Sequence, residues 1–112
     1  MPGEQPAEVA QMTVAELKTH LDSGRGFQLF DVRTPEERDI ARIDGSRLLD
    51  QEAAAYIETL PKDTMLVFHC HHGMRSQQAA EYFLEKGFTN LHNVVGGIDR
   101  WSLEIAPNVP RY

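Results

Sequence analysis

An apolar run, a loop with a cysteine and the start of a helix follow one another in residues 65–76, which read MLVFHCHHGMRS. The first four residues are continuously apolar, as expected for a strand that is covered on both faces of a sheet. After Gly73, apolar residues recur at helical spacing, and the inward face of this expected helix carries Ala79, Ala80, Phe83 and Leu84. The segment therefore predicts a buried parallel strand, a tight loop and an amphipathic helix.

The same two patterns alternate along the rest of the chain. Short apolar runs predict further strands at residues 27–32, 47–49 and 91–95. Capping residues followed by apolar periodicity predict helices that start at Thr13, Thr34, Asp50 and the Gly96-Gly97 pair. This alternation predicts an α/β fold with a parallel sheet between layers of helices.

The length of 112 residues fits a single domain over residues 1–112. We expect its core at about 9–105, between a loose polar N-terminal tail and a proline-containing tail at 107–112 that runs extended over the surface. The N-terminus lacks the basic and apolar regions of a signal peptide, and no apolar stretch reaches membrane-spanning length. These features predict a cytoplasmic protein, or a domain from a longer one.

The net charge is -6, and the chain has no run of lysine and arginine. A nucleic acid or an anionic membrane surface is therefore not an expected partner, because either would need a positive surface. Of the eleven cationic residues, eight are arginines, whose planar forks suit a small anion where several converge. The single cysteine excludes an intramolecular disulfide framework and a cysteine-rich zinc site.

Cys70 is predicted to lie at the carboxyl end of the strand, where parallel sheets bind ligands. A loop that curls into a helix start can direct several backbone N–H groups at one point, which favours a thiolate over a thiol. Gly73 permits the tight curl, and Arg75 adds a permanent positive charge. The alternative for a single cysteine is an inert, buried core residue.

Three segments of the chain resemble the rhodanese family. Residues 70–75 (CHHGMR) resemble its active-site loop, in which a catalytic cysteine begins a six-residue loop that wraps around its own sulfur. Residues 29–37 (LFDVRTPEE) resemble the signature after the family's second strand, and residues 95–101 (VGGIDRW) its final turn and helix. One departure is visible at residues 41–46 (ARIDGS), where only the isoleucine and the glycine of the usual stretch persist.

The resemblance covers about residues 9–105 and implies a three-layer α/β/α fold around a mainly parallel sheet of about five strands. It implies a single-domain rhodanese, a thiosulfate sulfurtransferase, with Cys70 as the nucleophile that carries sulfur as a persulfide. The loop expected to bind the substrate or the persulfide consists of His71, His72, Gly73, Met74, Arg75 and Ser76.

The resemblance also suggests that Asp31 and Arg33 mainly fix the loops by hydrogen bonds, although a role in the pocket stays open. We expect no cofactor and no metal, because His69, His71 and His72 lack a convergent ligand spacing. The expected partners are a small sulfur-donor anion and an external acceptor, such as glutathione, a thioredoxin-like dithiol or a partner protein.

Three alternatives remain from the sequence. A cysteine phosphatase or arsenate reductase is disfavoured, because only four residues separate Cys70 from Arg75 and a phosphate needs a wider ring of amides. A non-catalytic binding module is disfavoured by the presence of the cysteine, glycine and arginine. A dedicated persulfide carrier is not distinguished from an enzyme by the sequence.

Overall fold

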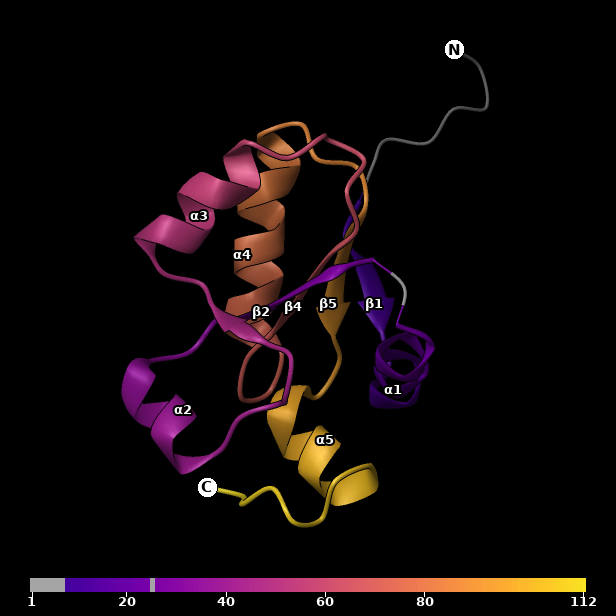
Figure 1. Ribbon diagram of the computed structural model, residues 1–112, viewed down its shortest axis with the longest axis vertical. Coiled ribbons are helices and arrows are strands. Elements are labelled where there is room, and N and C mark those ends of the chain that lie inside the picture. Colours follow the sequence, from indigo (N-terminus) through magenta and orange to yellow (C-terminus); the bar gives the residue numbers. More distant parts are fainter. Residues whose placement is uncertain (1–7, 25) are drawn as a thin grey trace.

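The computed structural model describes residues 8–24 and 26–112, so most of the predicted N-terminal tail, residues 1–7, lies outside the described residues. Within that part of the chain, strands and helices alternate (Figure 1). The strands are β1 (Ala10–Met12), β2 (Gln28–Asp31), β3 (Arg47–Leu48), β4 (Leu66–His69) and β5 (Leu91–Val94). The helices are α1 (Val14–Ser23), α2 (Pro35–Ile40), α3 (Gln51–Glu58), α4 (Met74–Glu85) and α5 (Gly97–Glu104).

The strands form one sheet in the order β1-β5-β4-β2-β3, and every neighbouring pair is parallel. The predicted α/β fold with a parallel sheet is therefore confirmed. β1 was not predicted, because its three residues show no apolar run and only Met12 is buried. It pairs with β5 and extends the sheet by one edge strand.

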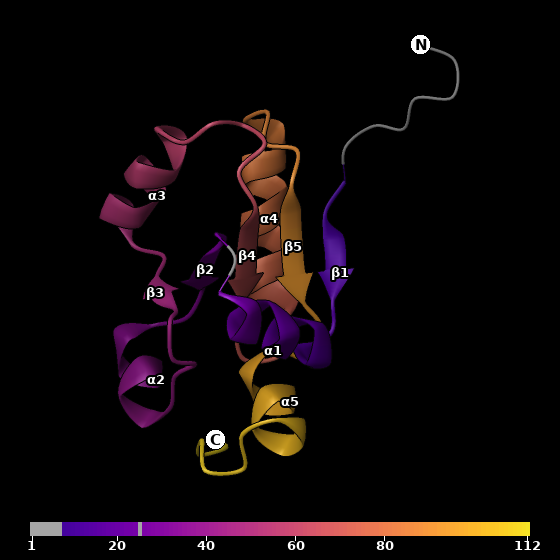
Figure 2. The ribbon, with the colours of Figure 1, turned by 45° about the vertical axis from the view of Figure 1, so that its right-hand side comes forward.

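Two hydrophobic clusters cover the two faces of the sheet. Successive strand residues point to opposite faces, so Leu29 and Val67 join one cluster, whereas Phe30 and Phe68 join the other. The first cluster includes residues of α1 and α5, and the second includes residues of α3 and α4. Figure 2 shows α1 in front of the sheet and α4 behind it. This arrangement is the predicted three-layer α/β/α fold.

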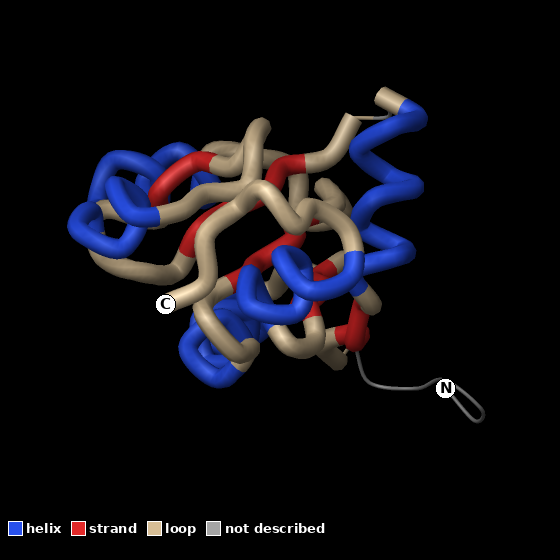
Figure 3. The backbone as a smooth tube through the Cα atoms, turned by 90° about the horizontal axis from the view of Figure 1, so that it is seen from below, coloured by secondary structure: helices blue, strands red, loops and turns tan. Residues whose placement is uncertain are grey.

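The carboxyl ends of the strands share one end of the molecule with α2, α5 and the C-terminal segment (Figure 1). Figure 3 views the molecule from that end and shows the C-terminal segment crossing in front of the strands. The segment at 106–112 contains neither helix nor strand. No described helix combines the length and apolar character needed to cross a membrane.

Candidate active site

Cys70 follows β4 directly and lies at the carboxyl edge of the sheet, with its side chain buried. The chain then turns through residues 71–73 into α4, whose N-cap is Gly73. Gly73 has φ +106°, a left-handed conformation that side chains disfavour. The sequence predicted Cys70 and Gly73 at this turn. In the structure, the turn curls around the sulfur atom of Cys70, and the N–H of Gly73 donates to it.

The sulfur of Cys70 accepts hydrogen bonds from the start of α4. The N–H groups of Gly73 and Ser76 donate to Sγ at 3.1 and 3.4 Å, and the Ser76 hydroxyl lies 3.3 Å away. Burial alone would raise the pKa of Cys70. The hydrogen bonds from Ser76, Gly73 and His72 outweigh that effect and hold the pKa of Cys70 below its ordinary value. The site therefore favours a thiolate nucleophile.

The start of α5 is hydrogen-bonded to the backbone of the same loop. The N–H of Ile98 donates to the carbonyl oxygen of Cys70 at 2.9 Å, and the N–H of Asp99 donates to that of His71 at 3.1 Å. Gly97 makes this approach possible, because a Cβ there would collide with both carbonyl oxygens. The resemblance to a final turn and helix at residues 95–101 thus corresponds to a direct contact with the cysteine loop.

Asp31 and Arg33 form a buried ion pair at the carboxyl end of β2. The guanidinium of Arg33 donates to both carboxylate oxygens of Asp31 at 2.8 Å and to the carbonyl oxygen of Ala41 at 2.7 Å. Arg38 adds a third bond to Asp31 at 2.8 Å. Burial opposes the charge on Asp31, but the two arginines and His69 lower the pKa of its carboxyl group. These contacts tie β2 to the segments on either side of α2, as a loop-fixing role requires.

Arg75 does not have a free guanidinium in this structure. It donates two hydrogen bonds to the Glu37 carboxylate at 2.8 and 3.0 Å. The pairing with Arg75 holds the pKa of Glu37 far below its usual range. An incoming anion must therefore compete with Glu37 for Arg75. The sequence gave no signal of this contact.

Tyr112 connects the C-terminal segment to the same charges. Its hydroxyl donates to Glu37 at 2.5 Å and accepts from Arg33 at 2.9 Å. Its ring stacks on His71, with centroids 4.0 Å apart and planes 8° apart. The sequence gave no indication that Tyr112 belongs to the site. Tyr112 therefore forms part of the wall beside the loop.

The three histidines around Cys70 occupy different environments: His69 is buried, His71 partly buried and His72 exposed. His69 is fully buried, and burial lowers its pKa to about 4, so its ring is neutral at pH 7. His71 is partly buried, and burial together with the neighbouring His72 lowers its pKa. Among residues 8–24 and 26–112, no group of three or more histidine, cysteine, aspartate or glutamate side chains is arranged to hold a metal ion. Met74, the remaining loop side chain, is 77% exposed.

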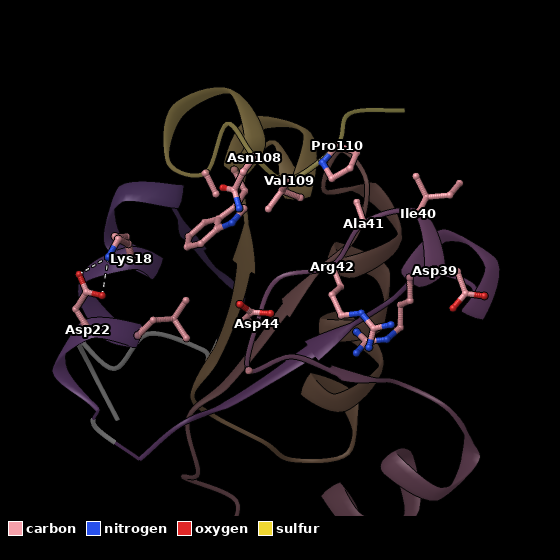
Figure 4. A pocket seen from close by; sticks show the side chains of 15 residues that line it. Lys18, Asp22, Asp39, Ile40, Ala41, Arg42, Asp44, Asn108, Val109 and Pro110 are labelled. Carbon is pink, nitrogen blue, oxygen red and sulfur yellow. Dashed lines mark hydrogen bonds and ion pairs between the residues drawn. The ribbon is translucent and has the colours of Figure 1, made fainter.

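A separate hollow of about 750 Å³ lies between α1, the segment after α2 and the C-terminal segment (Figure 4). Its lining includes Ala41, Arg42, Asp44 and Gly45, the stretch that departs from the family pattern. Cys70 is not among its lining residues. The departure therefore lies in the lining of this hollow, and the groups hydrogen-bonded to the Cys70 sulfur come from Gly73 and Ser76 instead.

A parallel α/β fold with a thiol held by the N–H groups of a helix start defines a class of cysteine-dependent group-transfer domains. Residues 13–104 match the Rhodanese-like domain family, and the chain belongs to that family. The crystal structure of a rhodanese-like domain protein from Staphylococcus aureus is similar, with a TM-score of 0.71 and 28% identity. That similarity covers 93% of this chain and 99% of that one.

Curated relatives carry sulfurtransferase names. Thiosulfate sulfurtransferase GlpE from Pseudomonas aeruginosa (strain LESB58) is 38% identical over 77 residues, which cover 68% of this chain and 70% of the relative. The probable adenylyltransferase/sulfurtransferase MoeZ from Mycobacterium tuberculosis (strain CDC 1551 / Oshkosh) is 35% identical over 111 residues. That match covers 96% of this chain but only 28% of MoeZ. The predicted family is confirmed, and these relatives support sulfur transfer as its chemistry.

Proposed function

We propose that this protein transfers sulfane sulfur from thiosulfate or a related donor to an external acceptor through a persulfide on Cys70. The observation that carries the proposal is the pair of backbone N–H groups, those of Gly73 and Ser76, that donate to the buried sulfur at 3.1 and 3.4 Å. Backbone N–H groups at a helix start stabilise an anion without being titrated themselves. They suit both the thiolate and the thiolate-like leaving sulfur.

The first step is an attack of the Cys70 thiolate on the outer sulfur of the donor. A new S–S bond forms, the donor's own S–S bond breaks, and sulfite leaves with that electron pair when the donor is thiosulfate. In the second step, a nucleophilic acceptor attacks the terminal sulfur, and Cys70 leaves as a thiolate. Covalent catalysis of this kind divides one difficult transfer into two easier ones.

The acceptor comes from outside the given chain, because Cys70 is its only cysteine and no internal disulfide can form. Glutathione, a thioredoxin-like dithiol or a partner protein supplies the required nucleophile, and cyanide replaces it in an assay. A reduced thiol at Cys70 suits the cytoplasm, where glutathione and thioredoxin keep thiols reduced. Neither step uses a metal or a cofactor in this proposal.

The pairing of Arg75 with Glu37 favours a second candidate, a dedicated persulfide carrier. Glu37 places a carboxylate beside the one cation of the loop, so a free dianion such as thiosulfate is attracted less strongly. A larger persulfide donor that docks on the protein does not depend on this charge. Carrier and enzyme then share the Cys70 chemistry and differ in the donor that they accept.

The test measures thiocyanate formation from thiosulfate and cyanide by the reduced protein and by Cys70→Ser. We expect turnover by the wild type alone, and intact-mass analysis should show one added sulfur after donor treatment. If no sulfane donor adds sulfur to Cys70, the sulfurtransferase proposal is wrong and a binding module is the better reading.

Glu37→Gln then separates the enzyme from the carrier. Glutamine preserves the capping of α2, in which the Glu37 side chain accepts from Thr34, while it removes the charge. An enzyme should show a KM for thiosulfate that is several-fold lower in Glu37→Gln, with kcat little changed. A carrier should show poor thiosulfate turnover in both proteins and rapid sulfur uptake from a protein persulfide.

A further inference from the structure

Ser76 lies between the reactive sulfur and a buried amide. Its Oγ is 3.3 Å from Cys70 Sγ and 2.5 Å from Oδ1 of Asn93, a buried residue on β5. A serine hydroxyl has one hydrogen and can donate it to only one of these two acceptors at a time. The direction of this bond therefore decides how much Ser76 stabilises a charge on Cys70.

Asn93 is the inner link of a chain of side-chain amides that leads to the surface. Its Nδ2 donates to Oε1 of Gln11 on β1 at 3.0 Å, and Nε2 of Gln11 donates to Oε1 of Gln77 on α4 at 2.8 Å. Nε2 of Gln77 then donates to the carboxylate of Glu81 at 3.0 Å. This series of hydrogen bonds thus joins β5, β1 and α4.

The carboxylate of Glu81 sets the direction of the whole chain. An ionised carboxylate only accepts, so Gln77 must turn its NH₂ group to Glu81 and its oxygen to Gln11. Gln11 must then present its NH₂ group to Gln77; the contact of this group with the carbonyl oxygen of Val9, at 3.5 Å, is at the limit of a hydrogen bond and adds little to this constraint. Gln11 consequently turns its oxygen to Asn93, and Asn93 turns its own oxygen to Ser76.

We propose that Asn93 is a positioning residue that holds the Ser76 hydrogen away from Cys70 Sγ, in a hydrogen-bond chain whose direction is fixed by Glu81. In the resting thiol, Cys70 donates its S–H hydrogen to Ser76 Oγ. When Sγ becomes negative, the hydroxyl can turn to the sulfur only by leaving the buried Oδ1 of Asn93 without a donor. Asn93 thus opposes ionisation of Cys70, while the backbone N–H groups favour it.

The functional importance of Asn93 rests on the proposed sulfur transfer, since Cys70 is the leaving group of its second step. Its physical effect, however, is a shift in the ionisation of the thiol, which is measurable whether or not the protein transfers sulfur. The charged or titratable groups on or against the loop include Arg75, His71, His72, Asp99, His69, Glu37 and Tyr112. All of them stay in place in the variants below, so their contributions cancel in the comparison.

The decisive experiment measures the rate of Cys70 alkylation by iodoacetamide as a function of pH. Asn93→Leu removes the acceptor and frees the Ser76 hydroxyl for the sulfur, so the thiol pKa should fall. Ser76→Ala removes an oxygen that accepts the S–H hydrogen and keeps its own hydrogen on Asn93, so this variant should not raise the thiol pKa. The fall in Asn93→Leu should be about half a unit to one unit, the value of one net hydrogen bond. A rise in either variant, or no shift in Asn93→Leu, would overturn the proposal.

A surface variant tests the hydrogen-bond chain between Glu81 and Ser76 without altering the core. Lysine only donates, so Glu81→Lys should reverse each amide in turn and direct the Ser76 hydrogen to the sulfur. Glu85→Lys, one turn further along α4, makes the same charge change without touching the chain. We expect the thiol pKa to fall more in Glu81→Lys than in Glu85→Lys, and this difference to vanish in a Gln77→Ala background.

Equal shifts in the two lysine variants, or a difference that survives in Gln77→Ala, would show that Glu81 acts through charge alone and would overturn the assigned direction. This pair of surface variants also decides the question if Asn93→Leu does not fold. A protein that fails to transfer sulfur but shows these pKa shifts would refute the proposed function and leave the role of Asn93 intact.

Discussion

The starts of α4 and α5 are built alike but bind different groups. Each helix begins at a glycine N-cap with positive φ, at Gly73 and Gly96, and neither has a side-chain cap. The free N–H groups of α4 turn to the Cys70 sulfur, whereas those of α5 turn to the carbonyl oxygens of Cys70 and His71. The start of α4 therefore binds the sulfur atom of Cys70, and the start of α5 binds the backbone on which that sulfur is carried.

The other helices show what these two starts lack. α1 and α2 begin with complete capping boxes at Thr13 and Thr34, and α3 begins with Asp50 as its cap. Those helices satisfy their first N–H groups with their own side chains. The first N–H groups of α4 and α5 instead donate to Cys70: those of α4 to its sulfur, and one of α5 to its carbonyl oxygen. The comparison teaches that uncapped helix starts mark the site in this fold.

The largest effect is expected where the α5 start meets the loop. Gly97→Ala combines a left-handed backbone, at φ +58°, with a Cβ that collides with two carbonyl oxygens. We expect a loss of about 3 kcal/mol or more in the free energy of unfolding, from backbone strain and overpacking together. Urea denaturation measures this loss, and sulfur transfer should fall with it.

Gly24→Ala is the matched control for this prediction. Gly24 has a similar φ of +66°, but a Cβ there would meet nothing within 4 Å. Its substitution should cost only the backbone strain, about 1 to 2 kcal/mol. Equal losses in the two variants would show that α5 does not hold the loop by close approach.

The next largest effect on stability is expected at His69, the last residue of β4, and it depends on pH. Burial lowers the pKa of His69 to about 4 from an ordinary value of 6.5. Between these values the unfolded chain binds a proton that the folded protein does not, so the stability falls as the pH falls through this window. The loss should reach about 3 kcal/mol near pH 4.

His69→Gln should remove that part of the acid sensitivity, as measured by urea denaturation at pH 7 and at pH 4.5. His71 and His92, whose pKa values are also lowered, remain in both proteins and cancel in the difference. An unchanged loss of stability on acidification would mean that His69 is not the buried neutral group described above.

A smaller change in stability but a clear change in rate is expected at the start of α4. Gly73→Ala strains a residue with φ +106° and places a Cβ 3.3 Å from the carbonyl oxygen of Val94. The free energy of unfolding should fall by about 1 to 2 kcal/mol. Because the Gly73 N–H is aimed at the sulfur, persulfide formation should slow by on the order of tenfold to a hundredfold.

Gly73→Val should slow persulfide formation further, because a branched side chain fits that conformation worse. Met74→Ala is the control, since this neighbouring side chain is 77% exposed. It should change the rate less than twofold, within the usual range for surface substitutions. A folded Gly73→Val variant that forms persulfide at the normal rate would contradict the role assigned to the α4 start.

Local patterns made most of the fold predictable. The apolar run before Cys70 indicated β4, and the threonine and glutamate spacing at Thr13 and Thr34 indicated two helix starts that the structure has as capping boxes. β1 was missed because an edge strand with a single buried residue has no periodic signal. Such signals lie within a few residues of one another, so the sequence displays them directly.

The site was predictable only as far as it is local. The turn from Cys70 to Ser76 is one continuous segment, and the sequence indicated it. The contact between Glu37 and Arg75 joins residues 38 positions apart, and Tyr112 lies 75 positions beyond Glu37. Nothing in a single sequence pairs such residues, because tertiary packing alone brings them together. Asn93 offered one faint signal, as an amide within an otherwise mostly apolar strand.

The charge of the Cys70 sulfur should be visible by spectroscopy, because two N–H groups share this atom as their acceptor. Two backbone amides, those of Gly73 and Ser76, have this one atom as their partner. The strength of such bonds depends on the charge of the acceptor. In an amide NMR spectrum, these two resonances should therefore move together when Cys70 gains or loses its charge, and the protein reports the state of its own sulfur without an added probe.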